Sequence, residues 1–366
     1  MITLRGSLIP ISSSFSVEGW PPTISRDLKE YLQPTFKSKP YLQVNQTISW
    51  RGKDYPKTYL VIVVHSSAHN GFERRQIIRQ TWAKDEKYLP TQIMFLLGRN
   101  AEFQHLIEEE IEAYNDILQA DFQDTYANLT LKSMFMLKYG ELLPENVVKY
   151  VMKVDDDSYI NLKRLVSYSE MIEKRCNQNC ILGKTFVDVQ NNWCLLITEF
   201  YQFAIAGHVL GPDSPVIRSK DHDRKFTVGW EVPWYIYNST TFPNAVSGSG
   251  YLISRKSIPC LYKAGLDTSF LNLEDVFITG LAASACHIKL INSRWFNFIG
   301  KSSRKVKNHD ILVHNVRNSS DMAFIYKKLH QFVDNSIWSI RETKSKYRHY
   351  LSVTVCIFHL IGEGIS

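Results

Sequence analysis

The sequence predicts an α/β protein of three layers, in which helices cover both faces of a mostly parallel sheet. Three observations predict this class. Apolar, β-branched runs of strand length recur at 58–65, 92–98 and 147–154. Runs with helical spacing of apolar residues separate them. The chain has 366 residues, 44% of them hydrophobic, so it can bury one large core or two moderate ones. Strands that alternate with helices in this way are typical of parallel sheets.

Three segments are expected along the chain. Residues 1–56 are rich in proline, serine and polar residues, and we interpret them as a poorly ordered stem or linker. Residues 57–340 are predicted to form one folded domain, and 341–366 a C-terminal tail. The expected elements are, in order, a strand at 58–65, a helix at 72–83, a strand at 92–98, helices at 101–118 and 128–143, a strand at 147–154, a helix at 162–174, a strand considered at 180–188, an irregular stretch at 189–235, a glycine-rich turn entering a short strand at 247–254, and a helix at 275–285.

Each main element has a local reason. The run at 58–65 is almost uninterrupted in its apolar character, as a strand buried on both faces requires. Ile77 and Ile78 lie on one side of the next helix, whose other side carries arginines. The helix at 101–118 has a glutamate-rich outer face, and Pro144 ends the helix after it.

Composition limits the classes of function. The net charge is +7 with lysine and arginine scattered, so we find no fingerprint of nucleic-acid binding and expect no nucleic-acid partner. Six cysteines without zinc spacing and four Asn-x-Ser/Thr sequons favour a compartment in which disulfides form. Neither Met1–Ser16 nor Tyr350–Ile361 is long and apolar enough to span a membrane. Either the protein is not secretory or the sequence begins after its anchor.

Three consecutive carboxylates, Asp155, Asp156 and Asp157, follow the strand at 147–154 directly. Neighbouring like charges raise one another's proton affinity, and a divalent cation such as Mg²⁺ or Mn²⁺ relieves that conflict. Ligands of open α/β sheets bind beyond the carboxyl ends of strands, which is where this triplet falls. The alternative is a solvated acidic turn, but the apolar residues on both sides favour a metal site.

Three further motifs each have a structural and a functional interpretation. Arg75 and Arg79 share a helix face, and they either clamp a phosphate or form a solvated basic surface. Asp275, directly after Glu274, caps the helix that follows or acts as a general base, and the two roles are compatible. His314 follows an apolar run, so it is a core residue unless the fold brings it to the triplet, where it would complete a metal site.

Taken together, six segments resemble the β1,3-glycosyltransferase family, which contains the β1,3-galactosyltransferases and the β1,3-N-acetylglucosaminyltransferases. Each segment alone is modest support, but all six occur in the family's order between about 58 and 330. The segments are Arg74–Trp82, Phe95–Gly98, Asp121–Lys132, Lys153–Asp157, Ser247–Tyr251 and Glu274–Val276.

The resemblance implies a GT-A type fold with a Rossmann-like nucleotide-binding half, a UDP-sugar donor, Mn²⁺, and an acceptor glycan on a glycoprotein or glycolipid. By analogy Asp155 and Asp157 are metal ligands, with Asp157 the most direct one, and His314 matches the family's metal-binding histidine. Asp275 matches the catalytic base of inverting hexosyl transfer. Nucleotide-side contacts are expected from Arg75, Arg79, Lys153, Asp155 and Asp156.

Two features depart from the family's pattern. Ala245 and Val246 stand where the family commonly has an aromatic residue and a cysteine, which puts the acceptor subsite and one family disulfide in question. Family members are normally Golgi membrane proteins with a lumenal catalytic domain, and the N-terminal anchor is not evident in this sequence.

Two other functions compete with the transferase. One is a non-catalytic relative that binds sugar or partner proteins, for which loss of the acidic triplet or of the base would be expected. The other is a metal-dependent phosphohydrolase, which often uses two metal ions and needs more carboxylates near the strand ends. The sequence leaves open the donor sugar (galactose or N-acetylglucosamine), the acceptor, the disulfides and the oligomeric state.

Overall fold

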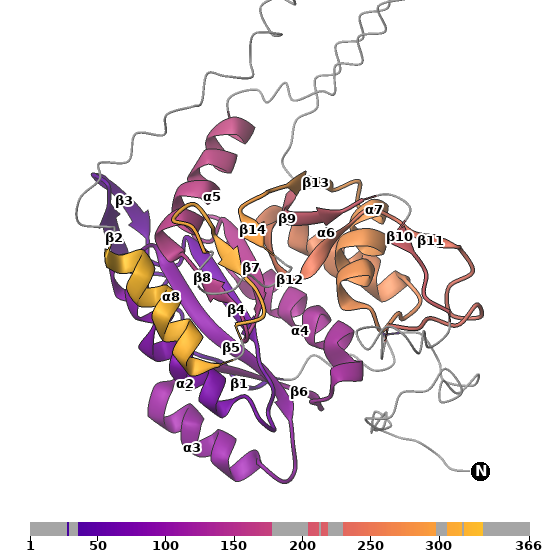
Figure 1. Ribbon diagram of the computed structural model, residues 1–366, viewed down its shortest axis with the longest axis horizontal. Coiled ribbons are helices and arrows are strands. Elements are labelled where there is room, and N and C mark those ends of the chain that lie inside the picture. Colours follow the sequence, from indigo (N-terminus) through magenta and orange to yellow (C-terminus); the bar gives the residue numbers. More distant parts are fainter. Residues whose placement is uncertain are drawn as a thin grey trace, which may run out of the picture. The chain divides into compact units, whose positions relative to one another are not determined.

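The computed structural model describes residues 28, 36–177, 204–211, 214–218, 230–297, 306–316 and 318–331 (Figure 1). Contacts between residues divide the chain into two units, 1–327 and 328–366. The boundary falls inside the helix α8 (Ser319–Gln331), so every strand belongs to the first unit. The fold is that of this first unit.

An eight-stranded sheet is the centre of the first unit. The strands are, in chain order, β1 (Phe36–Ser38), β2 (Thr47–Trp50), β3 (Lys53–Pro56), β4 (Leu60–His65), β5 (Thr91–Arg99), β6 (Ile117–Gln123), β7 (Tyr150–Asp155), β8 (Tyr159–Ile160), β9 (Ala204–Leu210), β10 (Ser214–Pro215), β11 (Thr241–Phe242), β12 (Ala245–Ser254), β13 (Lys289–Asn292), β14 (Phe296–Asn297) and β15 (Leu312–Val313). The sheet has the order β1-β6-β5-β4-β7-β12-β9-β13. Only β1 and β12 run against the other six strands.

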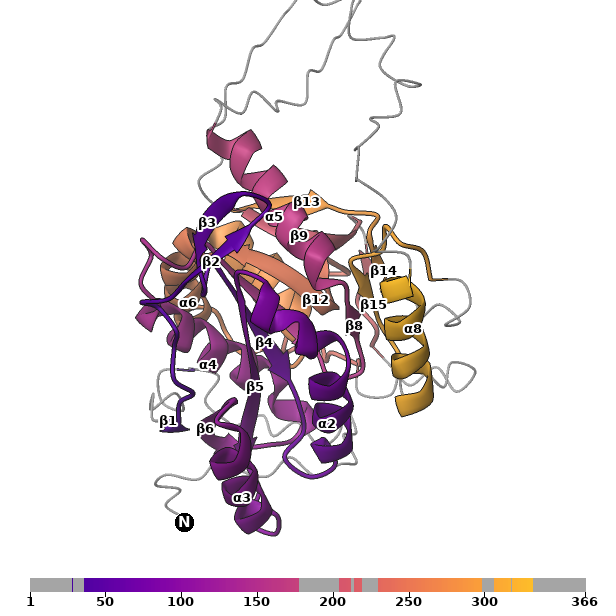
Figure 2. The same ribbon diagram turned by 90° about the vertical axis from the view of Figure 1, so that its left-hand side faces the viewer.

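Helices cover both faces of this sheet. They are α2 (Phe72–Gln80), α3 (Gln104–Tyr114), α4 (Leu129–Leu142), α5 (Leu162–Asn177), α6 (Ile258–Asp267), a π-helix (Val276–Ala282), α7 (Ala283–Ala285) and α8, with 3-10 turns at Trp82–Tyr88, Tyr126–Asn128 and Arg255–Ser257. In Figures 1 and 2, α2 lies on one face of the sheet, and α4 and α6 lie on the other. The prediction of a three-layer α/β fold with a mostly parallel sheet is confirmed.

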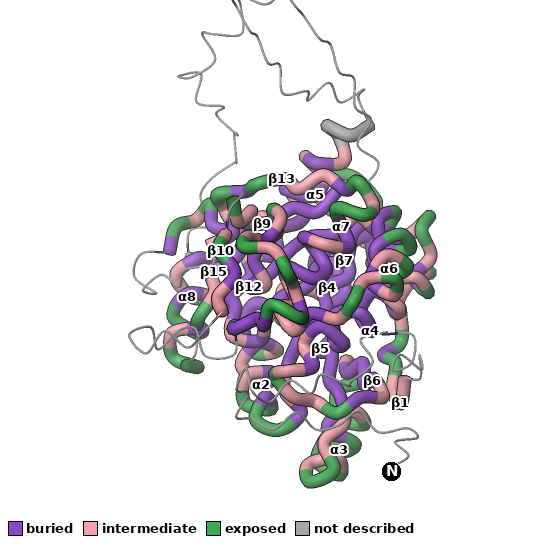
Figure 3. Tube along the Cα trace, turned by 90° about the vertical axis from the view of Figure 1, so that its right-hand side faces the viewer, coloured by how far each residue is buried: buried purple, intermediate pink, exposed green. Residues whose placement is uncertain are grey.

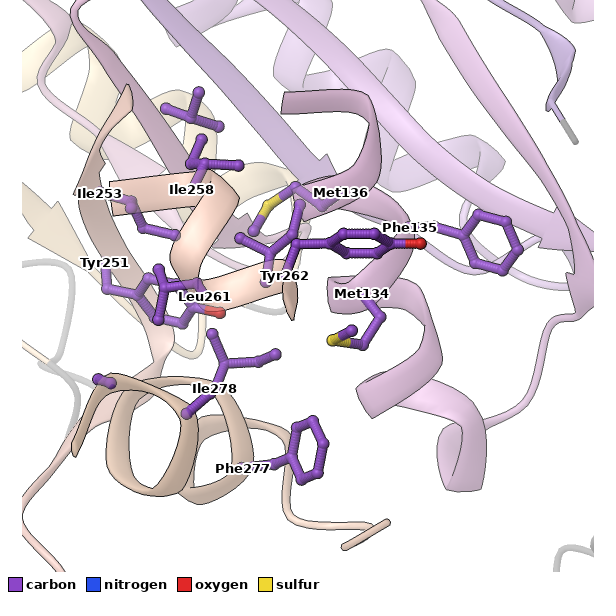
Figure 4. Close-up of a cluster of buried hydrophobic side chains, with 14 of the residues drawn as sticks. Met134, Phe135, Met136, Tyr251, Ile253, Ile258, Leu261, Tyr262, Phe277 and Ile278 are labelled. Atoms are coloured by element: carbon purple, nitrogen blue, oxygen red, sulfur yellow. The ribbon is translucent and has the colours of Figure 1, made fainter. Parts of the chain in front are cut away.

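The central strands are the most buried part of the fold (Figure 3). A large core lies between the sheet and the pair α4 and α6, where side chains of α4, α6, β12 and the π-helix meet (Figure 4). The two helices pack closely because glycines stand at their contact. A Cβ atom at Gly140 would lie 2.8 Å from Ile258, and one at Gly265 would lie 2.6 Å from Met134. A substitution at either glycine would require the facing side chain to shift.

Three predicted elements differ from the structure. The helix expected at 101–118 ends at Tyr114, because Asn115 adopts a left-handed conformation (φ 50°) and the chain then enters β6. The glycine-rich turn entering a short strand, expected at 247–254, is all part of the ten-residue strand β12, in which small residues suit close approach to neighbouring backbone. The stretch 189–235, expected to be irregular, contributes β9 to the sheet, and the strand considered at 180–188 lies outside the described residues.

The segment interpreted as a linker contributes to the fold. Within residues 1–56, β1 pairs with β6 at the edge of the large sheet, and β2 and β3 form a hairpin. A disulfide joins Cys260 of α6 to Cys286, just after α7. The tail at 341–366 lies outside the described residues. Among the helices that the structure describes, none combines the length and hydrophobicity needed to cross a membrane.

Candidate active site

The candidate site lies where the chain changes direction along the sheet. From β4 the chain continues to β5 and β6 on one side, and then returns to add β7 on the other side. His65, the last residue of β4, is paired in register with Asp155, the last residue of β7. The gap beyond two such strands, at the carboxyl edge of a parallel sheet, is the usual place for a ligand. The acidic triplet therefore begins at a topological switch point.

The three acids of the triplet divide into two roles. Asp156 turns away and is 6% exposed; it accepts hydrogen bonds from Arg74 and from the Ser66 hydroxyl, each at 2.7 Å. Burial raises the pKa of Asp156 despite these two donors, which lower it. Asp155 and Asp157 remain partly exposed, with 33% and 16% of their side chains accessible. The middle acid thus anchors the turn, while its neighbours face the site.

His314 reaches the triplet through the three-stranded sheet β14-β15-β8. Because β15 pairs with β8, which follows the triplet, the histidine after β15 lies beside the acids. Its Nε2 atom is 3.2 Å from Asp157 Oδ1 and 3.9 Å from Asp155 Oδ2. The structure therefore brings together the three residues that the sequence predicted as metal ligands.

Gly250 of β12 makes this approach of β15 possible. A Cβ atom at this position would lie only 2.3 Å from Cδ1 of Leu312 and 3.2 Å from the Lys153 carbonyl oxygen. Leu312 lies two residues before His314, so a side chain at Gly250 would require Leu312 to repack next to the segment that carries the histidine. The glycine in this strand is explained by close packing of one strand on another.

The donor atoms fit a divalent cation. Asp155, Asp157 and His314 offer ligand atoms that all lie within 4.8 Å of one another. Two carboxylates and an imidazole suit Mn²⁺ and similar ions. The carboxylates of the site outnumber its cations, with Asp155, Asp156, Asp157, Glu274 and Asp275 against Lys153 and Arg74. A bound divalent cation would offset this excess of negative charge.

Asp275 stands at the start of the π-helix, next to the backbone of β12. Its Oδ1 atom accepts a hydrogen bond from the backbone N–H of Val276 at 2.9 Å, and its Oδ2 atom accepts one from Gly248 at 3.1 Å. Burial raises the pKa of this carboxyl group, and the two hydrogen bonds oppose the rise. Each oxygen keeps a second lone pair, so the cap leaves Asp275 able to accept a proton.

Lys153 joins the metal-binding half of the site to the half that holds Asp275. Its Nζ atom lies 2.6 Å from Asp155 Oδ1, donates to the Gly248 carbonyl oxygen, and lies 3.6 Å from Glu274 Oε2. Burial lowers the pKa of Lys153, but Asp155 and Glu274 outweigh it and raise the pKa above its ordinary value. The residue is therefore a buried cation between the two groups of acids.

Sequence reasoning considered Glu274 only as the neighbour of Asp275, and the structure places its carboxylate 3.6 Å from Lys153 Nζ. It is buried and accepts hydrogen bonds from Ser133 and Tyr251, while burial raises its pKa. His65 was not singled out either. It is 4% exposed, and neither ring nitrogen has a hydrogen-bond partner in the part of the chain that the structure describes. The sequence offered one signal for His65, which is its position at the end of a predicted strand, where the acidic triplet also stands.

A buried ion pair shapes the loop after β4. Lys132 of α4 donates to the Ser66 carbonyl oxygen at 2.6 Å and to Asp124 Oδ1 at 2.7 Å. The other oxygen of Asp124 accepts from the backbone N–H groups of Ala68 and Gly98, each at 3.0 Å. Both charged residues belong to the Asp121–Lys132 motif. This motif therefore ties the loop after β4 and the residue after β6 to the end of β5.

Arg75 and Arg79 hold α2 to α3. Arg75 is 2% exposed and bonds both carboxylate oxygens of Glu110, and it also donates to the Ser67 carbonyl oxygen at 2.8 Å. Arg79 donates to both oxygens of Asp116 and to Glu110 at 2.7 Å. Their bidentate geometry is thus used on carboxylates of the protein itself, and a contact with a nucleotide stays a prediction.

Replacing Glu110 by alanine is expected to lower the free energy of unfolding by about 3–5 kcal/mol, because the buried guanidinium group of Arg75 loses its carboxylate partner. Arg75 and Arg79 outweigh burial and lower the pKa of Glu110, so its stabilising effect is present at neutral pH and disappears as the pH falls through the lowered value. Denaturant unfolding of Glu110→Ala and of its exposed neighbour Glu109→Ala measures the difference. Equal stability of the two variants would show that the arginines are not held by this network.

Comparison with known proteins identifies the family. A family model described as Galactosyltransferase matches residues 73–194 and 171–294, which together span well over half of the chain. The chain belongs to this family. The matched part includes the acidic triplet and Asp275, whereas His314 lies beyond its end.

Curated relatives are similar over a comparable stretch. Beta-1,3-galactosyltransferase 1 of Homo sapiens is 30% identical over 243 residues, which are 65% of this chain and 64% of that protein. Beta-1,3-galactosyltransferase 2 of Mus musculus is 26% identical over 303 residues, 80% of this chain and 64% of that protein. Lactosylceramide 1,3-N-acetyl-beta-D-glucosaminyltransferase of Rattus norvegicus is 28% identical over 277 residues, 72% and 62% of the two chains. The chain spans slightly less than two thirds of the length of these relatives.

Proposed function

We propose that this galactosyltransferase-family protein is an inverting hexosyltransferase, which moves galactose or N-acetylglucosamine from a UDP-sugar to a hydroxyl group of an acceptor glycan in β1,3 linkage. One observation carries the proposal. The cluster of Asp155, Asp157 and His314 and the carboxylate of Asp275 lie at one edge of the sheet, connected through Lys153. A donor site and a base side by side are what direct displacement at a sugar carbon requires.

In this mechanism the protein's residues hold the two substrates and move one proton. Asp155, Asp157 and His314 would hold Mn²⁺, which when bound supplies Lewis-acid neutralisation of the diphosphate. Asp275 takes the proton from the acceptor hydroxyl group, and that oxygen forms the bond to the anomeric carbon. The bond between this carbon and the diphosphate oxygen breaks, and UDP leaves from the opposite face. The configuration at the carbon is therefore inverted.

The remaining predicted site residues have supporting roles in the proposal. Lys153 keeps Asp155 and the backbone of Gly248 in place and adds positive charge near the departing diphosphate. Asp156 fixes the turn between its ligand neighbours through Arg74 and Ser66. Arg75 donates hydrogen bonds to Ser66 and Ser67 and so fixes the conformation of the loop after β4. Through this loop it would position the nucleotide.

We place the reaction in the lumen of the Golgi apparatus, in protein or lipid glycosylation. The Cys260–Cys286 disulfide supports an oxidising compartment. The family's missing cysteine at Val246 does not leave Cys260 or Cys286 without a partner, because these two pair with each other. Attachment to a membrane would come through an N-terminal anchor.

A panel of UDP-sugars with simple galactosides and N-acetylglucosaminides as acceptors tests the proposal. We expect transfer that depends on Mn²⁺, stops on chelation with EDTA and resumes when Mn²⁺ is restored. NMR of the product should show the β anomer linked through O3. Correctly folded protein that binds no UDP-sugar in the presence of Mn²⁺ would exclude the transferase, and binding without transfer to any acceptor would favour a sugar-binding relative.

A further inference from the structure

Four aromatic side chains, one in the turn before α4 and three in the segment 230–235, are exposed to solvent. Tyr126 is 66% exposed, Trp230 45%, Trp234 55% and Tyr235 54%. Trp230 and Trp234 are the exposed tryptophans among the residues that the structure describes, and they lie in one short segment with Tyr235. Trp230 donates a hydrogen bond to the Tyr126 hydroxyl oxygen at 3.3 Å, which joins this segment to the turn before α4. We name these four residues the aromatic platform.

Arg218 holds one of these rings in a fixed position. Its guanidinium carbon lies 3.7 Å from the centre of the Trp234 ring. The same group donates to the carbonyl oxygens of Val232 at 2.8 Å and Tyr237 at 2.7 Å, and also to that of Ser239. The arginine therefore spans the segment and covers one face of the indole, while Trp234 as a whole stays 55% exposed.

Two hydrogen bonds link the segments next to the platform to the stretch around Asp275. Tyr126 lies one turn before Thr130, whose hydroxyl donates to the Leu271 carbonyl oxygen at 2.7 Å. From the other side, Val246 follows the platform segment along the chain, and its N–H donates to Thr279 of the π-helix at 2.7 Å. These two bonds connect chain segments that follow Tyr126 and Tyr235 to the stretch from Leu271 to Thr279, which holds the proposed base.

Exposed aromatic groups of this kind mark a binding surface, because burying them elsewhere would have stabilised the fold. Flat tryptophan and tyrosine rings offer rigid contact area with a polar edge. The C–H face of a pyranose ring stacks on such a surface, while its hydroxyl groups reach polar atoms at the rim. We propose that the aromatic platform binds a sugar ring of the acceptor glycan, beyond the residue that receives the transferred sugar. This inference rests on the proposed function.

The test compares acceptor and donor kinetics in Trp234→Ala and Trp230→Ala. With lactose and N-acetyllactosamine as acceptors, each variant should raise the acceptor KM about tenfold or more, as loss of an aromatic anchor does elsewhere. The KM for the UDP-sugar and the slow hydrolysis of UDP-sugar without acceptor should not change. Trp234→Tyr should restore part of the acceptor affinity, because it keeps an aromatic face. Tyr88→Ala, with a side chain 62% exposed near the start of β5, is the matched control.

The contrary results are distinct from failure of the proposed function. The proposal that the platform binds the acceptor is wrong if the acceptor KM is unchanged in both tryptophan variants. It is also wrong if the donor KM rises as much as the acceptor KM. If the wild type transfers to neither disaccharide, saturation-transfer NMR with the same two sugars decides. A signal that Trp234→Ala abolishes supports the platform, and no signal with the wild type refutes it. Failure of the proposed function would instead show as no binding of UDP-sugar with Mn²⁺.

Discussion

The Asp275→Asn variant is expected to lose transfer activity by about two to four orders of magnitude in kcat, the usual contribution of a general base. Asparagine has nearly the same shape and still accepts from one backbone N–H group, but it cannot take a proton from the acceptor hydroxyl. The KM for the UDP-sugar should change little, because Asp275 is bound by Gly248 and Val276 and not by the predicted metal ligands. The measurement is initial rates with saturating donor and Mn²⁺.

Two comparisons separate this loss from misfolding. The thermal midpoint of Asp275→Asn should remain close to that of Asp54→Asn, a variant at an exposed surface aspartate that serves as the control. Because burial raises the pKa of Asp275, wild-type activity should fall as the pH drops through a value above the ordinary aspartate pKa, where the base becomes protonated. If Asp275→Asn retains a tenth or more of the wild-type kcat, Asp275 is not the general base.

The His314→Ala variant is expected to weaken the apparent affinity for Mn²⁺ by at least about 10–100-fold, since removal even of outer-shell partners costs that much. The donor KM should rise with it at low Mn²⁺ and recover in part at high Mn²⁺, because the two carboxylates remain. Calorimetric titration of Mn²⁺ in the presence of UDP measures the affinity directly.

His105, exposed on α3, provides the control for this prediction. His105→Ala should bind Mn²⁺ as the wild type does, with unchanged donor KM. If His314→Ala binds Mn²⁺ as tightly as His105→Ala, His314 is not a ligand and the site must be completed elsewhere. If Asp157→Asn also binds Mn²⁺ as tightly as His105→Ala does, the proposed metal site is wrong.

The class of fold could be predicted from local patterns because its central strands are buried on both faces. An uninterrupted apolar run such as Leu60–His65 has no other stable place than the middle of a covered sheet. Helix ends and edge strands were less predictable. The chain at Asn115 leaves the helix although the residues after it continue an apolar pattern, because pairing of β6 with β5 outweighs helical propensity there.

Most of the candidate site was present in the sequence as separate motifs. The triplet, the Glu274–Asp275 pair and the resemblance to the family indicated chemistry, because carboxylates in such number after apolar runs have few structural uses. The same patterns did not show the partners of Arg75 and Arg79. Helical spacing indicated that they share a face, but only the tertiary structure shows that this face is turned to Glu110 of α3 and to Asp116, which follows α3.

The sequence by itself determined the α/β class, the acidic triplet at the end of a central strand, and the family to which the chain belongs. Tertiary structure decided which acids face the site, how His314 arrives from 157 residues beyond Asp157, and how Lys153 joins the two halves. The physical reason is that strand formation and helix capping depend on residues close together in the sequence. The geometry of a metal site depends instead on contacts between segments far apart in the chain. Packing of β15 against Gly250 is such a contact, and no local pattern encodes it.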